Sequence, residues 1–466
     1  MSERPLPPMP SLSRWQQTRR FGQDPYGLMA ECHAECGTIF RLEPFGMGTW
    51  VLVIDPALLV ELHKKPEEEV LAGRIHKSFL GKTISPKASF SMDGEAFLRR
   101  RKAIVPLLTG KRAWAHAPRV RELTLAMIDQ LTEGDQPVTF QPPILELTTK
   151  SILDLLVGDS VDDATYARLL HRAERYLGAF RHPMVLGPLK VSLGGLTPYG
   201  RFLKQRERIW ELVVEIGEAR AARPIPEEPG DVMQAMIRLL REEAGSEDGW
   251  SREMLAHEIV GLLVGGSEST AGTMMWTLHG LLDAPEVMER LRAELVERVG
   301  DGLVDQQAAR HLPYLDAVIN EGIRYHPIGP FAGIRTAAAD VELGEYRIPE
   351  GTILAQCLGQ AGRLPSIFPA AERFDPEANF LGRRLKPTEW LPFGGGLRQC
   401  FGRGMALMQL SVMLSELVRR VDLKLAPGSR RPKRQGIAFY PENGLRMWAR
   451  RRSPSQQEED ASRITA

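Results

Sequence analysis

One cysteine in a glycine-rich loop constrains this chain more than any other feature of its sequence. Cys400 stands in the run Phe393-Gly394-Gly395-Gly396-Leu397-Arg398-Gln399-Cys400-Phe401-Gly402, after which a helix is expected to begin. Glycines lack a Cβ and adopt positive φ readily, so the loop can lie flat against a large planar group. The amides at the start of the helix point toward the sulfur and favour a thiolate over a thiol. This geometry suits a thiolate ligand for haem iron, and Arg398 can reach a carboxylate of that cofactor.

The same run matches the pattern Phe-x-x-Gly-x-(Arg/His)-x-Cys-x-Gly at every fixed position. It therefore resembles the haem-binding signature of the cytochrome P-450 family. The resemblance implies haem b (iron protoporphyrin IX) held by Cys400, with Arg398 at a propionate and with Phe393, Gly394, Gly396 and Gly402 around the cofactor. The simpler alternative, a buried cysteine in an ordinary turn, explains the glycines but not the arginine and the helix together.

The rest of the chain is mostly helical in pattern, and glycines and prolines separate the helices. We expect a helix over Pro25–Cys36 and two strands over Thr38–Leu42 and Trp50–Ile54. Further β signals come near Val341–Ile353 and Gly436–Met447. The pattern predicts a mainly α fold with small β-sheets.

The length of 466 residues would by itself favour two or three domains. The resemblance instead implies the cytochrome P-450 fold, a single large domain with a long central helix over the haem. We expect this domain over residues 1–452, with a proline-rich arm at residues 1–10. Residues 453–466 are polar and lack periodicity, which is typical of a disordered tail.

Charge, cysteine content and hydropathy limit the class of protein. The chain has 60 Lys and Arg against 59 Asp and Glu, a balance that argues against nucleic-acid binding. Its four cysteines form no disulfide framework, as expected in a reducing cytosol. Cys32 and Cys36 suggest zinc at first sight, but their spacing fits the packed face of a helix and no second ligand pair follows. No window reaches the ~20 apolar residues of a membrane span and no signal pattern is present, so we expect a cytoplasmic monomer of bacterial type.

A second motif is Glu321-Gly322-Ile323-Arg324, in which the two charged residues are neighbours on one helical face. It resembles the Glu-x-x-Arg helix of cytochromes P-450, where the buried pair holds the core on the haem side. The resemblance implies a third partner from a Pro-Glu-Arg-Phe type of segment. Ala371-Glu372-Arg373-Phe374 stands in that place, so Arg373 is the expected partner, with Arg383 or Arg384 as weaker substitutes.

A third motif lies in a long apolar helix that is expected to open at Ser251, a plausible N-cap. Gly265 and Gly266 interrupt this helix at a cost of about 1 kcal/mol each, which either close packing or room over the haem would explain. Glu268 and Ser269 follow, and a carboxylate with a hydroxyl could relay protons to oxygen. The block resembles the Ala/Gly-Gly-x-(Asp/Glu)-Thr motif of oxygen-activating members, with Ser269 in place of threonine and Thr270 displaced by one position.

The resemblance also assigns residues outside the three motifs. Arg101 takes the arginine of a Trp/His-x-x-x-Arg pattern in which phenylalanine replaces the first residue, and Arg335 is the expected second clamp on the haem. The basic run Arg99-Arg100-Arg101-Lys102 is usually a solvated face, but here it could steer an acidic ferredoxin. Residues assigned to the substrate pocket are Leu80, Phe90, Ile328, Phe331 and Phe439.

These features predict a haem-thiolate monooxygenase that hydroxylates an apolar small molecule such as a terpenoid, a fatty acid or a steroid. The expected partners are a ferredoxin and its reductase, because no flavin segment is visible in the sequence. A peroxide-driven peroxygenase remains an alternative that Glu268 disfavours. A non-catalytic haem sensor or ligand-binding protein is a second alternative, against which the Glu268 and Ser269 pair counts less strongly.

Overall fold

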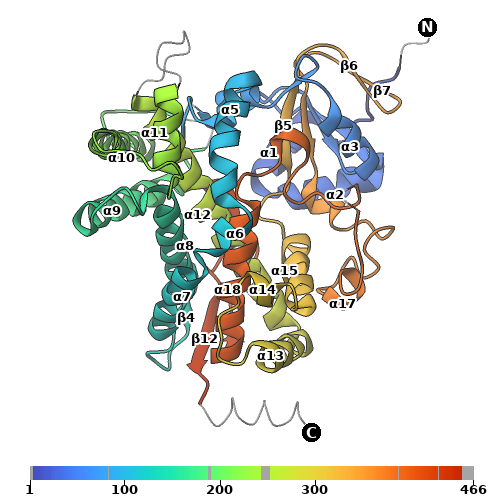
Figure 1. Cartoon of the computed structure of the whole chain (residues 1–466). Helices are drawn as coiled ribbons and strands as arrows, with labels where there is room; N and C mark the ends of the chain where they lie inside the picture. Colours follow the sequence, from blue (N-terminus) through green and yellow to red (C-terminus); the bar gives the residue numbers. More distant parts are fainter. Residues whose placement is uncertain are drawn as a thin grey trace.

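The computed structural model describes residues 4–81, 83–186, 190–242, 252–386, 388–428 and 430–453. Helices dominate this part of the chain, as predicted, with small sheets around them (Figure 1). The helices are α1 (Arg14–Gln23), α2 (Pro25–Cys36), α3 (Pro56–Lys64), α4 (Gly73–His76), α5 (Gly94–Ile104), α6 (Gly110–Trp114), α7 (Ala117–Leu131), α8 (Gln141–Val157), α9 (Asp163–Phe180), α10 (Pro198–Ala221), α11 (Val232–Glu242), α12 (Arg252–Asp283), α13 (Pro285–Val299), α14 (Gln306–Ala309), α15 (Pro313–Tyr325), α16 (Leu358–Ala361), α17 (Pro376–Asn379) and α18 (Arg403–Arg420).

The long helix α12 forms the centre of the molecule and lies against α8, α10 and α15 (Figure 1). Its apolar residues belong to the largest buried cluster of the described residues, together with those of α7, α8 and α18. Close approach to α10 is possible because Gly217 stands opposite Leu255, whose side chain lies 2.4 Å from where a Cβ would be. The N-cap expected at Ser251 lies outside the described residues.

The principal sheet has five strands in the order β1-β2-β8-β5-β3. The predicted strands near the N-terminus are confirmed as an antiparallel pair in which Leu42 faces Trp50. β2 then pairs in parallel with β8, far along the chain. The proline-rich arm is fixed to this region, because the Pro8 carbonyl accepts from the Arg41 amide. The strands are β1 (Ile39–Leu42), β2 (Trp50–Val53), β3 (Val70–Leu71), β5 (Ala332–Ala337) and β8 (Ile353–Gln356).

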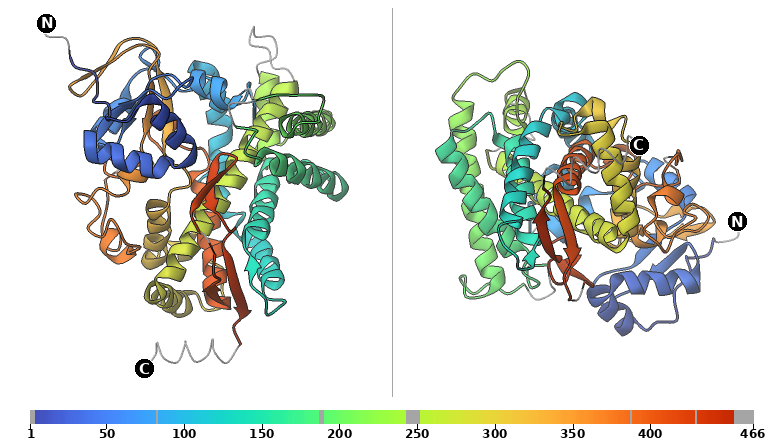
Figure 2. Two further views of the ribbon diagram at one scale, coloured as in Figure 1. Left: turned by 180° about the vertical axis from the view of Figure 1, so that it is seen from behind. Right: turned by 90° about the horizontal axis from the view of Figure 1, so that it is seen from below.

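The expected β signal over Gly436–Met447 separates into two strands that belong to different sheets. β11 (Ala438–Pro441) pairs with β10 (Pro432–Gln435), and β12 (Arg446–Arg451) lies between β4 (Val138–Thr139) and β9 (Val421–Leu425). β6 (Val341–Leu343) and β7 (Tyr346–Ile348) form a further hairpin. Figure 2 shows the red strands of the C-terminal part lying over the long helix, and β11 contacts α12. This contact carries side chains of β11 to the candidate site.

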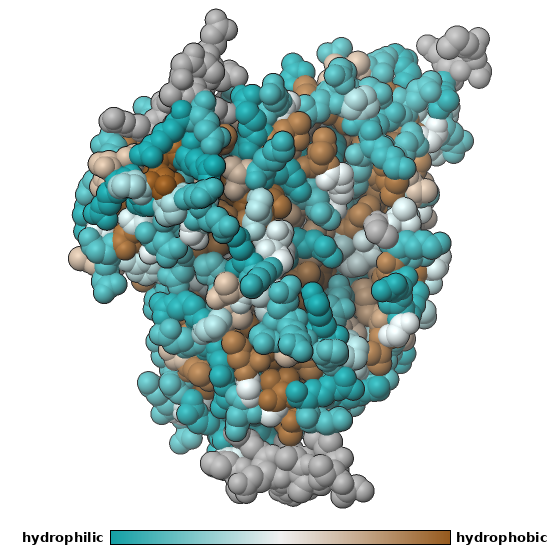
Figure 3. Space-filling model, viewed as in Figure 1, coloured by the Kyte–Doolittle hydropathy of each residue, from teal (hydrophilic) through white to brown (hydrophobic). Residues whose placement is uncertain are grey.

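The surface seen in Figure 3 is mostly hydrophilic, with apolar residues scattered in small groups. Within the described ranges, no helix is both long enough and apolar enough to cross a bilayer.

Candidate functional site

The cysteine loop is closed by a hydrogen bond from the Cys400 amide to the Phe393 carbonyl, 2.9 Å long. Gly394 and Gly396 have φ of 70° and 62°, which side chains other than glycine rarely adopt. Gly395 is required for a different reason, since a Cβ there would lie 2.6 Å from Nδ1 of His63. The course of the loop therefore depends on two glycines with positive φ and on one close contact.

Cys400 is exposed to solvent, although protein surrounds it on most sides. Burial raises the pKa of the Cys400 thiol. The amides of Gly402 and Arg403 and the charges of Arg101 and Arg403 act in the opposite direction. Coordination to a metal ion would outweigh the effect of burial, because a coordinating thiol is deprotonated outright.

Three arginines assigned from the sequence surround the loop. Arg101 donates to the Gln399 carbonyl at 2.7 Å, and its guanidinium lies 5.0 Å from the centre of the Phe401 ring. Arg398 pairs with Asp93 at 2.5 Å and lies over the Phe97 ring, 3.6 Å from its centre.

Arg335 differs from the other two, because it is only 5% exposed and no hydrogen bond or ion pair to its guanidinium is found in the described part of the chain. Burial, followed by the positive charge of Arg398, lowers the pKa of Arg335 to about 10. A buried cation without a counter-ion is costly, so the site calls for an anion beside Arg335. Haem would supply a propionate as the anion beside Arg335 and iron as the partner of the Cys400 sulfur. The residues present therefore fit that cofactor.

The two glycines of α12 have different surroundings. Gly265 is exposed, and a Cβ there would meet nothing within 4 Å, whereas a Cβ at Gly266 would lie 2.7 Å from Ile152 of α8. Gly265 therefore leaves open space, and Gly266 permits close helix packing. Ser269, one turn after Gly265 on the same face, donates its hydroxyl proton to the Gly265 carbonyl at 2.5 Å. Thr270 is 3% exposed.

Glu268 is completely buried beside this open face and is held by two partners. Its Oε1 accepts from Arg181 at 2.8 Å, and its Oε2 accepts from the Tyr440 hydroxyl at 3.0 Å. Burial raises the pKa of Glu268, and Arg181 and then Tyr440 oppose that shift. Arg181 also lines a cavity of about 400 Å³ between α8, α9 and β10.

Glu321 and Arg324 form a fully buried, bidentate ion pair with distances of 2.6 and 2.7 Å. All five N–H donors of Arg324 are used, because the carbonyls of Gly362, Ala371 and Arg373 accept the remaining three. Glu321 also accepts from the amide of Asp375 at 2.6 Å and from the side chain of Asn379 at 3.1 Å.

The expectation that the Arg373 side chain completes this pair is corrected by the structure. That side chain is 77% exposed and faces Asp375, so only the Arg373 carbonyl reaches Arg324. Arg383, the weaker substitute, donates to the carbonyls of Ala378, Asn379 and Ile367 instead. The third partner of Glu321 is Asn379.

Two of the residues assigned to the substrate pocket lie along the open face of α12. Gly261, Gly265 and Gly272 share that face. A Cβ at Gly261 would lie 2.9 Å from the Phe90 ring, and one at Gly272 would lie 3.2 Å from Ile328. Phe90 and Ile328 therefore stand toward opposite ends of a stretch that has Gly265 and Ser269 between them.

The other assigned pocket residues are placed differently. Phe331 packs against Phe21 and Trp50, with ring centres 5.4 Å apart in both cases. Phe439 packs against Tyr26 at 5.3 Å, because alternation along β11 turns Tyr440, and not Phe439, toward Glu268. The side chain of Leu80 lies outside the described residues.

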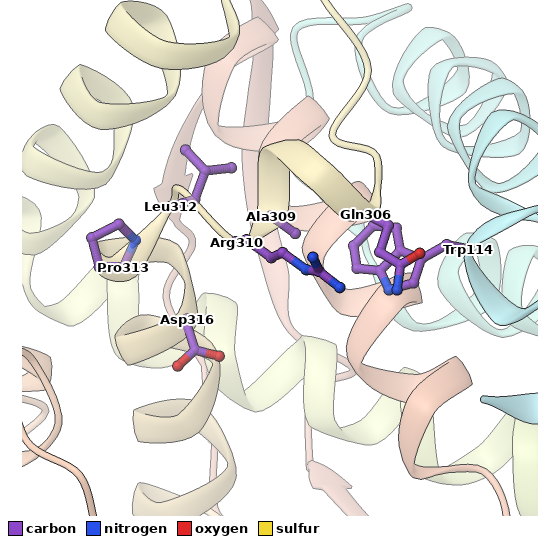
Figure 4. Close-up of a pocket in the computed structure, with 7 residues that line it drawn as sticks. All are labelled: Trp114, Gln306, Ala309, Arg310, Leu312, Pro313 and Asp316. Atoms are coloured by element: carbon purple, nitrogen blue, oxygen red, sulfur yellow. The ribbon is translucent and has the colours of Figure 1, made fainter. Parts of the chain in front are cut away.

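A separate surface pocket of about 460 Å³ lies between α6, α14 and α15 (Figure 4). In that view the guanidinium of Arg310 extends toward Gln306 and Trp114, and Asp316 lies on the opposite side. None of the residues assigned to the site from the sequence lines this pocket.

Sequence reasoning missed Arg181, Tyr440 and Asn379 as site residues. The period-two alternation of a strand signals that Phe439 and Tyr440 face opposite sides. Asn379 stands between Pro376-Glu377 and Phe380, a second segment similar to Pro-Glu-Arg-Phe with one extra residue. Nothing local distinguishes Arg181, whose partner is 87 residues away.

Comparisons with known proteins give the family and the fold of this chain. A family model described as Cytochrome P450 matches residues 4–444. Cytochrome P450 138 of Mycobacterium tuberculosis is 29% identical over 417 residues, which cover 89% of this chain and 90% of the relative. Cytochrome P450 135B1 of Mycobacterium bovis is 28% identical over 456 residues, which cover 96% and 91%. Among solved structures, retinoic acid bound cyanobacterial CYP120A1 has a TM-score of 0.79 at 21% identity, with 97% of this chain and 100% of that chain covered.

Proposed function

The chain belongs to the cytochrome P450 family, and we propose that it inserts one oxygen atom from O2 into a C–H bond of an apolar small molecule. Members of this family are haem-dependent monooxygenases, so the protein is an oxidoreductase that uses haem b. The observation that carries the more specific proposal is the position of a buried carboxylate, Glu268, next to a hydroxyl, Ser269, on the open face of α12.

In this proposal Cys400 and Arg335 would hold the cofactor. Bound haem supplies the oxygen chemistry, and thiolate ligation favours O–O cleavage. Arg335 binds a propionate, because it is the buried cation without a counter-ion. Arg101 and Arg398 already have protein partners, and these hold the loop and α5 together.

In this proposal, protons reach the open face of α12 through Glu268 and Ser269. The cavity beside Arg181 supplies solvent protons, and the Glu268 carboxylate is the buried acceptor next to it. Ser269 lies on the open face. Its hydroxyl can pass a proton toward the reacting oxygen and take up another proton in its place.

The substrate is an apolar molecule such as a terpenoid, a fatty acid or a steroid. Phe90 and Ile328 support this class, because they flank the open face of α12 with hydrocarbon surface. The similar solved protein holds retinoic acid, which is mostly hydrocarbon, and this supports the same class.

Family members generally take electrons from redox partners, and we propose a ferredoxin with its reductase for this chain. Lys102 and Arg403 are exposed beside the cysteine loop and suit an acidic partner. Arg100 does not belong to that surface, because it is buried and pairs with Glu258 at 3.2 Å. A cytoplasmic location remains a prediction from the sequence.

One experiment separates this proposal from the two alternatives. Oxygen consumption is followed with NADPH, a ferredoxin and its reductase, and a peroxide-driven assay is run beside it on the same candidate substrates. We expect hydroxylated product in the first assay, with the oxygen atom derived from labelled O2. Product formed from peroxide alone would instead indicate a peroxygenase, and no product in either assay would indicate a sensor or a binding protein.

A further inference from the structure

The imidazole of His63 occupies a position that neither the sequence motifs nor the proposed chemistry explains. His63 lies near the end of α3 and packs against the cysteine loop from outside the loop's own sequence. A Cβ at Gly395 would lie 2.6 Å from its Nδ1, and a Cβ at Gly396 would lie 2.7 Å from its carbonyl oxygen. A Cβ at Gly333, two residues before Arg335, would lie 3.6 Å from its Nε2. Gly395 thus leaves room for the ring, Gly396 leaves room for the His63 backbone, and Gly333 lies in ordinary contact with the ring edge.

Both ring nitrogens of His63 are buried, and neither has a hydrogen-bond partner among the described residues. Burial, followed by the charge of Arg335, lowers the pKa of His63 to about 4, so the ring is neutral with one N–H donor. A buried donor without an acceptor is unfavourable, and native structures satisfy nearly all such groups. The surroundings of His63 are therefore completed by a group that the polypeptide does not supply.

The missing group is an anion, because two guanidinium groups, those of Arg335 and Arg398, lie in this region and Arg335 has no ion-pair partner among the described residues. Arg335 is buried without a counter-ion, and Arg398 adds a second positive charge beside it. The carboxylate of Asp93 acts on Arg335 but is paired with Arg398, which also pairs with Glu67 at 3.5 Å. A neutral N–H donor beside an unpaired guanidinium is suited to a carboxylate.

We propose that His63 is a cofactor-positioning residue that donates a hydrogen bond to the haem propionate bound by Arg335. This inference rests on the proposed function only because it requires haem. His63 lies outside the three sequence motifs, so none of them assigns it this role. His63 would link α3, the cysteine loop and the strand of Arg335 through one ligand group.

The test is the rate at which haem passes from the purified holoprotein to excess apomyoglobin, followed by absorbance. His63→Leu should lose haem about tenfold faster than the unchanged protein, the factor expected for one hydrogen bond to a charged group. Asn and Gln place an amide N–H near the Nδ1 and Nε2 positions respectively, so one of His63→Asn and His63→Gln should restore slow loss. The resonance Raman band of propionate bending should shift in His63→Leu and return in the restoring variant.

His171→Leu, at an exposed histidine of α9, is the matched control and should leave the rate unchanged. Thermal unfolding of the apoproteins separates a packing role, because the proposal predicts that the His63→Leu apoprotein, which lacks the unpaired buried donor, unfolds at or above the midpoint of the unchanged apoprotein. If His63→Leu takes up no haem in cells, reconstitution of its apoprotein with haemin gives the same comparison.

An unchanged rate of haem loss in His63→Leu would overturn the inference. Equal acceleration in all three variants, accompanied by destabilised apoproteins, would overturn it as well. A failure of the proposed function is seen separately, since it would change the products of the unchanged enzyme and not the order of haem loss among these variants.

Discussion

Replacement of Glu321 by alanine should remove most of the stability of the folded protein. The substitution leaves the guanidinium of Arg324 fully buried without its counter-ion, and breaking such a pair costs about 3–5 kcal/mol. The amide of Asp375 and the side chain of Asn379 also lose their acceptor, which adds about 1–3 kcal/mol for each group that stays unsatisfied. Native proteins are stable by only about 5–15 kcal/mol, so the sum approaches the whole stability.

The assay is the yield of soluble protein with bound haem, together with the thermal unfolding midpoint. We expect Glu321→Ala to give insoluble or haem-free protein. Arg373→Ala is the matched control, because its side chain is 77% exposed and its pair with Asp375 contributes at most about 1 kcal/mol. Soluble Glu321→Ala with full haem content and an unchanged midpoint would refute the reasoning, and loss of haem in Arg373→Ala would show that its side chain has a role beyond the pair with Asp375.

Three further predictions concern α12 and its partners. Ser269→Ala should still bind haem and consume reductant but release more hydrogen peroxide per hydroxylated product. Thr270→Ala should have the smaller effect, because Ser269 lies on the open face and Thr270 is buried. Uncoupling in Thr270→Ala alone would contradict this prediction. Tyr440→Phe removes a donor that lowers the pKa of Glu268, so the acidic limb of the pH–rate profile should move to higher pH, and an unmoved limb would count against the contact. Asn379→Ala should lower the unfolding midpoint to a value between those of Arg373→Ala and Glu321→Ala, because it removes one neutral donor to Glu321 and leaves the charge pair intact.

Local sequence signals predicted the elements whose ends are set by short-range chemistry. The helix Pro25–Cys36 was predicted residue for residue, because Pro25 opens it and Gly37, with φ of 85°, ends it. The strands on either side of Gly46 and Gly48 were predicted because glycines mark a turn, and both glycines adopt positive φ there. The resemblance to cytochromes P-450 that the three motifs carry predicted the fold.

The remaining parts of the site depend on contacts between distant segments. Arg181, Tyr440 and Glu268 come from three elements, and no spacing in the sequence brings them together. Arg373 was expected because its segment matched a residue type, whereas in the structure the buried side chain of Asn379 reaches Glu321. Phe331 and Phe439 were assigned to the substrate pocket, yet their rings pack against Trp50 and Tyr26 respectively.

The central claim is that Cys400 binds haem iron as a thiolate. The direct measurement is the absorption spectrum of the dithionite-reduced holoprotein under carbon monoxide. The account predicts the strongly red-shifted Soret band that thiolate ligation produces, and its loss in Cys400→Ser. A spectrum of the histidine-ligated type in folded, haem-loaded protein would contradict the account.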